Sequence, residues 1–350
     1  MGILWYATRE DVKSALDMME TARNDAQVDR ANDAAFLAIN SLTHRRFYPE
    51  VATRYFDWPN FQYAQPWRLW LDSNDLISAT TVTSGGTAVS STDYFLRRSD
   101  DRDEPPYRYV EIDLGSSSAW SGGSTTPQRS IVINGLWGYG NDETPAGSLA
   151  EALDISETGV DVTDSYTIGV GSIIRVDSER MIVTGKAMLT TGQSALASLT
   201  AVNSDVLVSV TTGSAFTIGE VILLDAERMK IVDIAGNSLI VKRAWDGTVL
   251  ATHTTPTIYA PRTLIVRRGA LGTSATAHDT ATAIYRHDPA PGIRELAVAE
   301  AATSLIQEGS GWARTAGQGD NARETLGRGL IDLRNQARDE YALQARTMAI

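Results

Sequence analysis

The spacing of apolar residues divides the chain into a helical start, a β-rich middle and a helical end. Thr8 is followed by acidic residues at 10 and 11, which is typical of a helix N-terminus, and apolar residues then recur every three or four positions. The same spacing runs from about 25 to 44, where most apolar residues are Ala, and predicts a helix that packs closely on a neighbour. It returns over 293–305 and, after a Gly-rich break at 309–319, from about 322. Two helices are therefore expected at each end.

Between the helical ends the pattern changes to short alternating or β-branched segments, which are typical of strands. Pairs such as Gly85-Gly86 and Pro105-Pro106 separate these segments up to about residue 140. A Thr-, Ser- and Val-rich stretch then continues to about 286, with a short possible helix at 148–153 and almost no other helical spacing. The sequence therefore predicts an α+β fold in three parts: N- and C-terminal helices forming a helical bundle (1–47 and 289–350), a small β domain (48–143) and an inserted all-β domain with two related units (144–288).

The inserted region contains internal repeats, which are the most specific signal in the chain. Asp177-Ser-Glu-Arg-Met181 recurs as Asp225-Ala-Glu-Arg-Met229, and the pattern Arg-x3-Gly-Thr-x4-His occurs at Arg243–His253 and Arg268–His278. Their order suggests a nested arrangement, in which an inner unit of about 205–259 interrupts an outer unit made of 160–190 and 260–286. A simple tandem that has lost one segment is the alternative. We expect a fragment of about 155–288 to fold by itself.

Composition and charge narrow the classes of function. The chain of 350 residues is long enough for two or three modules. It has no Cys, which excludes disulfides, thiolate metal sites and Cys nucleophiles. Its 4 His leave little for imidazole catalysis or a zinc site. The net charge of −12 has the wrong sign for a protein that grips nucleic acid through its phosphates. No apolar run is long enough for a membrane span, and the start of the chain does not resemble a secretory signal.

The repeated acids are the strongest candidates for chemistry, but a structural role explains them better. Asp177 with Glu179, and Asp225 with Glu227, could bind a metal or act as acid and base in a hydrolase. Each pair lies beside an Arg and recurs in both copies, as turns that define a fold do. Replacing either Glu by Gln should therefore change melting only modestly and leave the metal content at zero.

Other residues with possible chemistry also have simpler explanations. His253 and His278 recur with the same Gly-Thr turn and are interpreted as structural hydrogen-bonding groups. Met181 and Met229, at the ends of the repeated motifs, are predicted to anchor the core. The small β domain contains an aromatic cluster that invites a sugar-binding interpretation, but core or subunit packing is more typical. That cluster consists of Trp58, Trp67 and Trp70.

No residue of the chain is predicted to be catalytic, to bind a cofactor or to ligate a metal, so we do not expect an enzyme. The Gly-rich break at 309–319 lacks the residues of a phosphate-binding loop. Arg45 and Arg46 could touch a phosphate, but a cap at the helix end or a salt bridge between subunits is more typical.

Five short motifs follow one another along the chain. They are Thr43-His-Arg-Arg-Phe47-Tyr, Arg54-Tyr-Phe-Asp-Trp-Pro59, Trp67-Arg-Leu-Trp-Leu-Asp72, Asp75-Leu-Ile77 and Ile133-Asn-Gly-Leu-Trp-Gly-Tyr139. Their order resembles that of the head-to-tail connector, or adaptor, of tailed bacteriophages. The resemblance covers about 1–140 and 289–350 and includes the two N-terminal helices and the terminal helical pair. The 155–288 region departs from a minimal connector and resembles β modules of phage structural proteins.

The resemblance implies a structural virion protein without enzymatic activity, located in the viral neck and assembled in the host cytoplasm. Such proteins form an oligomeric ring of about twelve subunits that docks on the portal protein and receives the next tail-side neck protein, a stopper or tail terminator. DNA passes through the lumen without sequence-specific binding, and no membrane is involved. A negatively charged wall would suit DNA ejection, because it repels the phosphates.

The resemblance also implies where this chain contacts its partners. The expected portal or subunit contacts are Arg45, Arg46, Arg338, Tyr341, Leu343 and Arg346. We expect residues after about Asn335 to be mobile in the free subunit and ordered in the assembled neck; a final helix folded back on its own subunit is the alternative. A different function, a tail-fibre or baseplate component that binds host glycans through its β repeats and Trp residues, also remains open.

Overall fold

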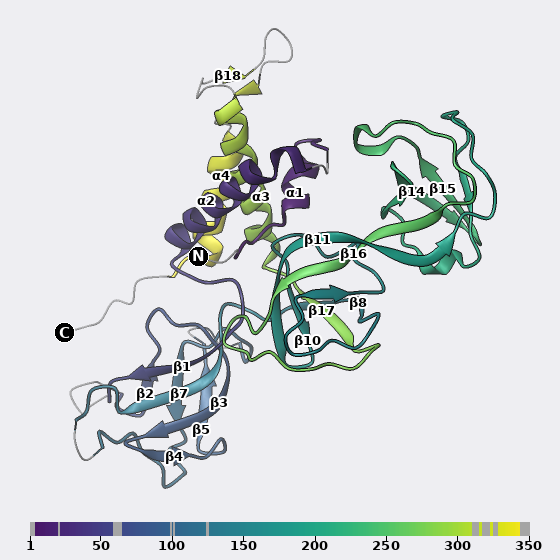
Figure 1. Cartoon of the computed structure of the whole chain (residues 1–350). Coiled ribbons are helices and arrows are strands. Elements are labelled where there is room, and N and C mark those ends of the chain that lie inside the picture. The colour runs from purple at the N-terminus through teal and green to yellow at the C-terminus, as the bar shows by residue number, and fades with distance from the viewer. Residues whose placement is uncertain are drawn as a thin grey trace. The chain divides into compact units, whose positions relative to one another are not determined.

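The computed structural model describes most of the chain (Figure 1). It covers residues 4–19, 22–58, 65–98, 100, 102–123, 126–309, 315–316, 323–324 and 328–343. The chain forms two compact units. Unit 1 comprises Met1–Phe36, Glu143–His287 and Ala297–Leu326, and unit 2 comprises Leu37–Asp142, Asp288–Leu296 and Gly327–Ile350. Each unit is therefore assembled from segments that lie far apart in the sequence.

The described residues contain four α-helices: α1 (Arg9–Ala15), α2 (Asp25–Thr43), α3 (Pro291–Gly309) and α4 (Arg328–Tyr341). Short 3-10 turns lie at Ala22–Asn24, Gly213–Ala215 and Trp245–Gly247. The predicted cap of α1 is confirmed: the Thr8 hydroxyl accepts from the backbone N–H of Asp11, and the Asp11 carboxylate accepts from the backbone N–H of Thr8. None of these four helices is both long and apolar enough to cross a membrane.

Ion pairs in unit 1 join α1 to the first turns of α2. The Arg9 guanidinium donates to both carboxylate oxygens of Asp29, at 2.8 and 2.7 Å, and to Asp25 at 3.0 Å. Lys13 also pairs with Asp25, although its side chain is only 3% exposed. A buried ammonium group is costly unless it is paired. The two pairs therefore hold α1 in one position against α2.

Unit 2 contains two antiparallel sheets within its described residues. Its strands are β1 (Glu50–Phe56), β2 (Arg68–Trp70), β3 (Leu76–Ser84), β4 (Thr87–Val89), β5 (Tyr94–Arg97), β6 (Tyr109–Ile112) and β7 (Ile131–Trp137). One sheet has the order β1-β7-β3-β4 and the other β2-β6-β5. Every second residue of β7 is buried, which is the period expected of a strand with one face on a core. Ile131, Ile133 and Trp137 are the fully buried members of this face.

Unit 1 contains an antiparallel ten-stranded sheet. Its strands are β8 (Glu143–Ser148), β9 (Gly159–Asp161), β10 (Ile173–Val176), β11 (Glu179–Ser194), β12 (Leu207–Ser209), β13 (Val221–Leu224), β14 (Glu227–Ala235), β15 (Ser238–Lys242), β16 (Thr257–Arg267) and β17 (Ala283–His287). Their order is β12-β15-β14-β13-β16-β11-β10-β17-β8, with β9 also paired to β16. A separate two-stranded pair joins β18 (Thr315–Ala316) to β19 (Arg323–Glu324).

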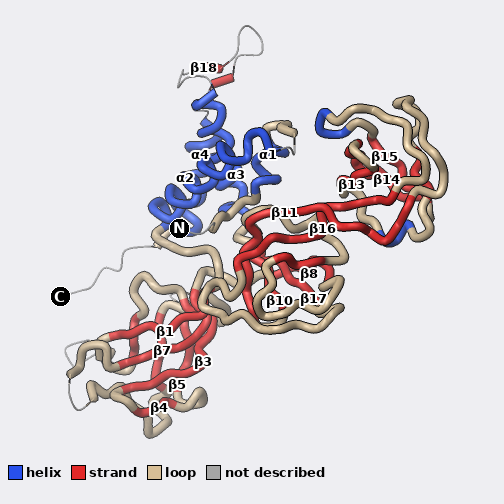
Figure 2. Tube along the Cα trace, in the orientation of Figure 1, coloured by secondary structure: helices blue, strands red, loops and turns tan. Residues whose placement is uncertain are grey.

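The ten-stranded sheet of unit 1 contributes strands to two separate hydrophobic cores. The outer core draws its buried residues from 146–183 and 264–284, and the inner core draws its residues from 195–258. The paired strands β11 and β16 run from one core to the other, and Figure 2 shows them side by side along this path. Met181 lies in the outer core and Met229 in the inner core, both fully buried, so the prediction that they are core anchors is confirmed.

The predicted α+β fold, a helical bundle with a small β domain and an insertion, is wrong, because the chain is mostly β. The described structure is 21% helical and 36% strand, and its largest sheet has ten strands. The strong helical spacing is confined to the ends, whereas β11 is rich in Thr and Gly and mostly half-buried after Val183, so its alternation is weak. The possible helix at 148–153 is also wrong, since Leu149 and Leu153 form β-bridges.

We expect a fragment of residues 143–288 to be more stable than the fragment 155–288. The longer fragment keeps β8 and the buried residues Ala146, Leu149 and Leu153, all part of the outer core. Removing a buried Leu side chain costs about 2–5 kcal/mol. Thermal melts followed by circular dichroism should therefore show a cooperative β-type transition for 143–288, at least about 10 °C above that of 155–288. Equal melting temperatures would contradict the assignment of β8 to this core.

Candidate functional site

The repeated Asp-x-Glu motifs form the same tight turn in both cores. Asp177 lies between β10 and β11 with φ 49°, and Asp225 lies between β13 and β14 with φ 50°. Asp tolerates this left-handed conformation better than most side chains do. Each turn places the Glu two residues later at the start of the next strand, where Glu179 and Glu227 are buried.

Glu227 is the centre of a charge cluster in the inner core. Its carboxylate accepts two hydrogen bonds from the Arg243 guanidinium, both 2.8 Å long, and one from His253 Nε2 at 2.9 Å. The backbone N–H groups of Ala244 and Ala251 donate to the same carboxylate at 2.9 and 3.0 Å. The side chains of Glu227, Arg243 and His253 are all 0% exposed. Five donors therefore occupy the lone pairs of one buried carboxylate.

The outer core repeats this cluster around Glu179. Arg268 donates at 2.7 and 2.8 Å, and His278 contacts the carboxylate at 2.9 Å. Backbone N–H groups of Gly269 and Thr276 supply the remaining bonds, at 2.9 and 3.1 Å. Glu179 thus pairs with the second Arg-x3-Gly-Thr-x4-His segment and Glu227 with the first. These pairings match the nested arrangement, in which the inner unit interrupts the outer one, and not a simple tandem of the two units.

Each histidine links the two acids of its motif. His253 contacts Glu227 through one ring nitrogen and Asp225 through the other, the latter at 2.7 Å. Its counterpart His278 contacts Asp177 at 2.8 Å in the same way. A carboxylate only accepts hydrogen bonds, and a neutral imidazole has one N–H to donate whereas the imidazolium has two. Each ring ties the buried Glu of its motif to the exposed Asp of the turn.

The two buried carboxyls are held in their ionised form. Burial by itself raises the pKa of Glu179, but the hydrogen bonds from Arg268, His278 and two backbone N–H groups outweigh burial, and the pKa falls from 4.5 to about 2. The pKa of Glu227 falls to about 2 for the same reasons. A carboxylate that is fully hydrogen-bonded and this acidic is a poor proton acceptor. The clusters therefore stabilise the fold, and the structural interpretation of the acids and histidines agrees with their geometry.

No family model, curated protein or solved structure matches the chain.

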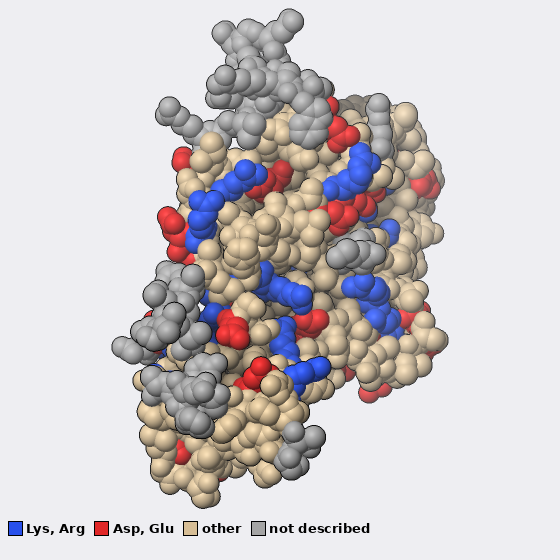
Figure 3. Space-filling model, turned by 90° about the vertical axis from the view of Figure 1, so that its left-hand side faces the viewer, with Lys and Arg blue, Asp and Glu red and all other residues tan. Residues whose placement is uncertain are grey.

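Within the described part of the chain, no group of three or more His, Asp or Glu side chains is arranged to hold a metal ion. On the face that Figure 3 shows, basic and acidic side chains are interspersed and separated by uncharged surface.

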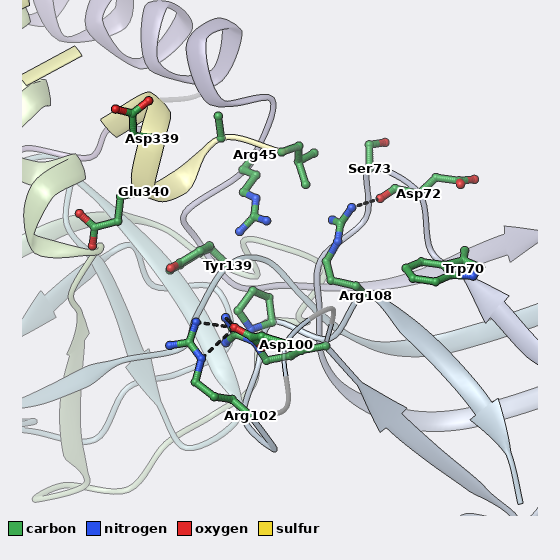
Figure 4. Close-up of a pocket in the computed structure, with 14 residues that line it drawn as sticks. Arg45, Trp70, Asp72, Ser73, Asp100, Arg102, Arg108, Tyr139, Asp339 and Glu340 are labelled. Atoms are coloured by element: carbon green, nitrogen blue, oxygen red, sulfur yellow. Dashed lines mark hydrogen bonds and ion pairs between the residues drawn. The ribbon is translucent and has the colours of Figure 1, made fainter. Parts of the chain in front are cut away.

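A cavity in unit 2 brings together two of the predicted contact residues (Figure 4). Its volume is about 940 Å³, and its lining includes Arg45 from the segment after α2 and Leu343 from the segment after α4. Tyr341 is not part of the lining; it is 7% exposed and in edge contact with the rings of Phe47 and Tyr139. The backbone N–H of Leu343 donates to the carbonyl of Thr43 at 3.0 Å, so the end of α4 is folded back on its own unit.

The other predicted contact residues lie outside this cavity or outside the described residues. Arg46 lines a neighbouring cavity of about 700 Å³ and pairs with Glu50 at 3.1 Å. Arg338 is exposed on α4, and Arg346 falls outside the described residues. The predicted mobility of the segment after Asn335 stays a prediction for residues 344–350. Up to Leu343, the final helix is folded back on its own subunit, as in the alternative stated above.

Sequence reasoning missed three arginines of the cavity: Arg98, Arg102 and Arg108. Arg45 and Arg108 share Asp75, at 3.6 and 3.0 Å, while Arg98 and Arg102 share Asp100, at 2.8 and 2.6 Å. The run of charged residues at 97–104 was the one sequence signal for these arginines. The sequence does not show that Arg45 and Asp75, which are remote from this run, lie near it in the fold.

The predicted core role of the Trp cluster is confirmed for two of its members. Trp58 and Trp67 pack on the core of unit 2, and their indole N–H groups donate to the Trp120 carbonyl at 2.9 Å and to Glu111 at 3.2 Å. Trp70 differs, because it lines the cavity and packs on Tyr109, with the two ring centroids 4.6 Å apart.

Stability should fall in acid because of Glu179 and Glu227. Their folded-state pKa of about 2 lies below the ordinary value of 4.5, so the stabilisation is fully present above about pH 4.5 and is lost as the pH falls towards 2. The shift corresponds to at most about 3 kcal/mol for each carboxylate. Urea unfolding at pH 6, 4 and 2.5 should show this loss in the wild type. A stability that does not change over this range would contradict the assignment.

Proposed function

We propose that this protein is a structural subunit of the tailed-phage neck, a head-to-tail adaptor that forms a ring beneath the portal through which DNA passes. The observation that carries the proposal is the meeting of two remote parts of the chain at one surface of unit 2. Arg45 follows α2 and Leu343 follows α4, and both line the same cavity. These are the segments in which the connector-like motifs place portal or subunit contacts.

The end of α4 is built to present side chains at this surface. Tyr341 fills the space between Phe47, Tyr139 and Gly292, with ring centroids 5.7 Å from Phe47 and 5.5 Å from Tyr139. Such packing holds the last turn of the helix in one orientation. Arg338 and Asp339, on the same turn, are exposed and available to a partner. This arrangement supports a docking role for α4 without a disorder-to-order transition up to Leu343.

The nested β modules support a structural role as well. Their candidate catalytic acids are saturated by internal donors, and each module has its own core and its own charge cluster. The net charge of −12 is compatible with a channel wall that repels DNA. A glycan-binding tail component has less support, because the indoles of Trp58 and Trp67 are used in the core of unit 2.

The purified protein should form rings with a central channel, and it should bind its portal protein. Negative-stain electron microscopy of the protein alone, and of its mixture with the portal, tests both points. We expect closed rings of about twelve subunits that stack on portal rings. A monomer that forms no ring, with or without the portal, would contradict the adaptor function.

A pair of charge reversals on α4 tests the docking role separately. Arg338→Glu changes an exposed residue of the predicted contact set, and Asp332→Lys changes an exposed residue of the same helix outside that set. Neither side chain is buried, so both variants should fold and melt as the wild type does. We expect Arg338→Glu to weaken portal binding at least about tenfold in sedimentation assays, a loss of about 1.4 kcal/mol, with Asp332→Lys unchanged. Equal binding by both would remove α4 from the interface.

A further inference from the structure

We propose that one end of the inner module is an acceptor site for a third β module of the same kind. The inner module comprises the strands around the inner core, from the second half of β11 to the first half of β16, and the outer module comprises those around the outer core. The acceptor site consists of residues 212–214 and the turn Gly236-Asn237 between β14 and β15. It lies in unit 1 and does not depend on the adaptor function.

The two modules share one pattern of strand pairing. In the outer module β11 pairs with β10 and with the second half of β16, and in the inner module β14 pairs with β13 and with β15. The first half of β16 pairs with β13 and with the second half of β11, as β17 does with β10 and β8. The backbone N–H of Val162 donates to the carbonyl of Arg262 as that of Val210 does to Asn237, both at 2.9 Å. Arg262 and Asn237 therefore occupy equivalent positions.

This equivalence identifies the point at which the inner module enters the outer one. In the outer module, Ala187 pairs with Thr263, and the whole inner module lies between them in the chain. In the inner module, Ala235 pairs with Ser238, and only Gly236-Asn237 joins them. The turn of the inner module is thus the counterpart of the position that already carries a module.

Side chains at the end of the outer module hold the inner module in place. The ring of Tyr166 lies against Gly219, where φ is 93° and a Cβ would lie 2.6 Å from the ring atoms. Only glycine allows both this backbone conformation and this close approach. The carboxylate of Asp164 accepts a hydrogen bond from the hydroxyl of Thr217 at 2.9 Å.

A buried ion pair completes the contact between the modules. The guanidinium of Arg262 donates two hydrogen bonds to the Glu220 carboxylate, both 2.8 Å long, and another to the carbonyl of Ala215 at 2.7 Å. The side chains of Arg262 and Glu220 are only 7% and 1% exposed. A buried pair is stabilising only where its geometry is good and its other donors are used, as they are here.

The equivalent end of the inner module is exposed. Residues 212–214 take the place of 164–166, since the same turn hydrogen bond, 3.1 Å long, closes each stretch. Thr212 and Ser214 are both exposed, and a Cβ on Gly236 would meet no described atom within 4 Å. The inner module therefore has the acceptor turn but lacks the side chains that would hold a further module.

The occupant has to be a module whose two ends are adjacent. In the outer module, Leu189 pairs with Ala260 just beyond the joint, so the β11–β16 ladder continues across it. An inserted module of this kind closes its own ends, and the turn that receives it pays little additional loop-closure entropy. Exposed turns are also the positions at which inserted domains are best tolerated.

A chain with three nested modules tests the acceptor site. Gly236-Asn237 is replaced by a second copy of residues 188–262, which reproduces the outer joint at the inner turn. A second chain also carries Thr212→Asp and Ser214→Tyr in the module that receives the insertion, as counterparts of Asp164 and Tyr166. We expect additional β-type circular dichroism from both chains, and the added module should melt at least about 4 °C higher in the second chain.

The same two substitutions in the natural chain are the matched control. Thr212→Asp and Ser214→Tyr lie on an exposed end to which nothing is docked in the described structure, so the melting temperature should change by less than about 2 °C. An added segment that stays unfolded in both three-module chains would overturn the acceptor site. Equal melting of the added module with and without the two substitutions would overturn it as well.

Two glycine variants test the contact between the existing modules without any insertion. Gly219→Ala and Gly236→Ala both place a Cβ at a positive φ, 93° and 61°, but only the first meets the ring of Tyr166. We expect Gly219→Ala to lower the melting temperature of the inner module at least about 4 °C more than Gly236→Ala does. Equal effects would show that Tyr166 does not hold the inner module and would overturn the model for the acceptor.

Discussion

The β modules of unit 1 depend on one interaction, the burial of a glutamate that is fully neutralised by an arginine, a histidine and two backbone N–H groups. An ionised carboxylate cannot remain in a hydrophobic core unless its charge and its lone pairs are satisfied. In each module the donors come from the loop that follows the partner strand, so the loop can take only one path. The Arg-x3-Gly-Thr-x4-His spacing is the length that brings Arg243 and His253 to the same carboxylate.

The need to neutralise each buried glutamate locally also explains why the module around the inner core can be inserted into the module around the outer core. Each cluster is closed within its own module, since Glu179 uses Arg268 and His278 while Glu227 uses Arg243. The inner module interrupts the outer one between β11 and β16, which continue from one core to the other as a paired ribbon. Neither core has to supply a charged partner to the other.

Much of the module chemistry could be predicted from the sequence, because repetition marks residues that the fold requires. The two Asp-x-Glu turns, their histidines and the nested order are all present in the spacing of short motifs. The fold class could not be predicted in the same way, since Thr- and Gly-rich strands such as β11 show little alternation and the Ala-rich helices show a strong period. The cavity was missed because Arg108 and Asp75, 33 residues apart, meet only after β-strand pairing has taken place.

The stability of Glu227→Gln, compared with that of Asp225→Asn, tests the central claim most directly. Both substitutions remove one carboxylate charge at nearly constant volume from the same cluster, but Glu227 is 0% exposed and Asp225 is 64% exposed. Sequence reasoning expected a modest effect for the glutamate. The geometry predicts a loss of roughly 3–5 kcal/mol, because Arg243 becomes an uncompensated buried charge and His253 loses its buried partner. Asp225→Asn should cost less than about 1 kcal/mol. Urea unfolding in which Glu227→Gln is as stable as the wild type would contradict the account.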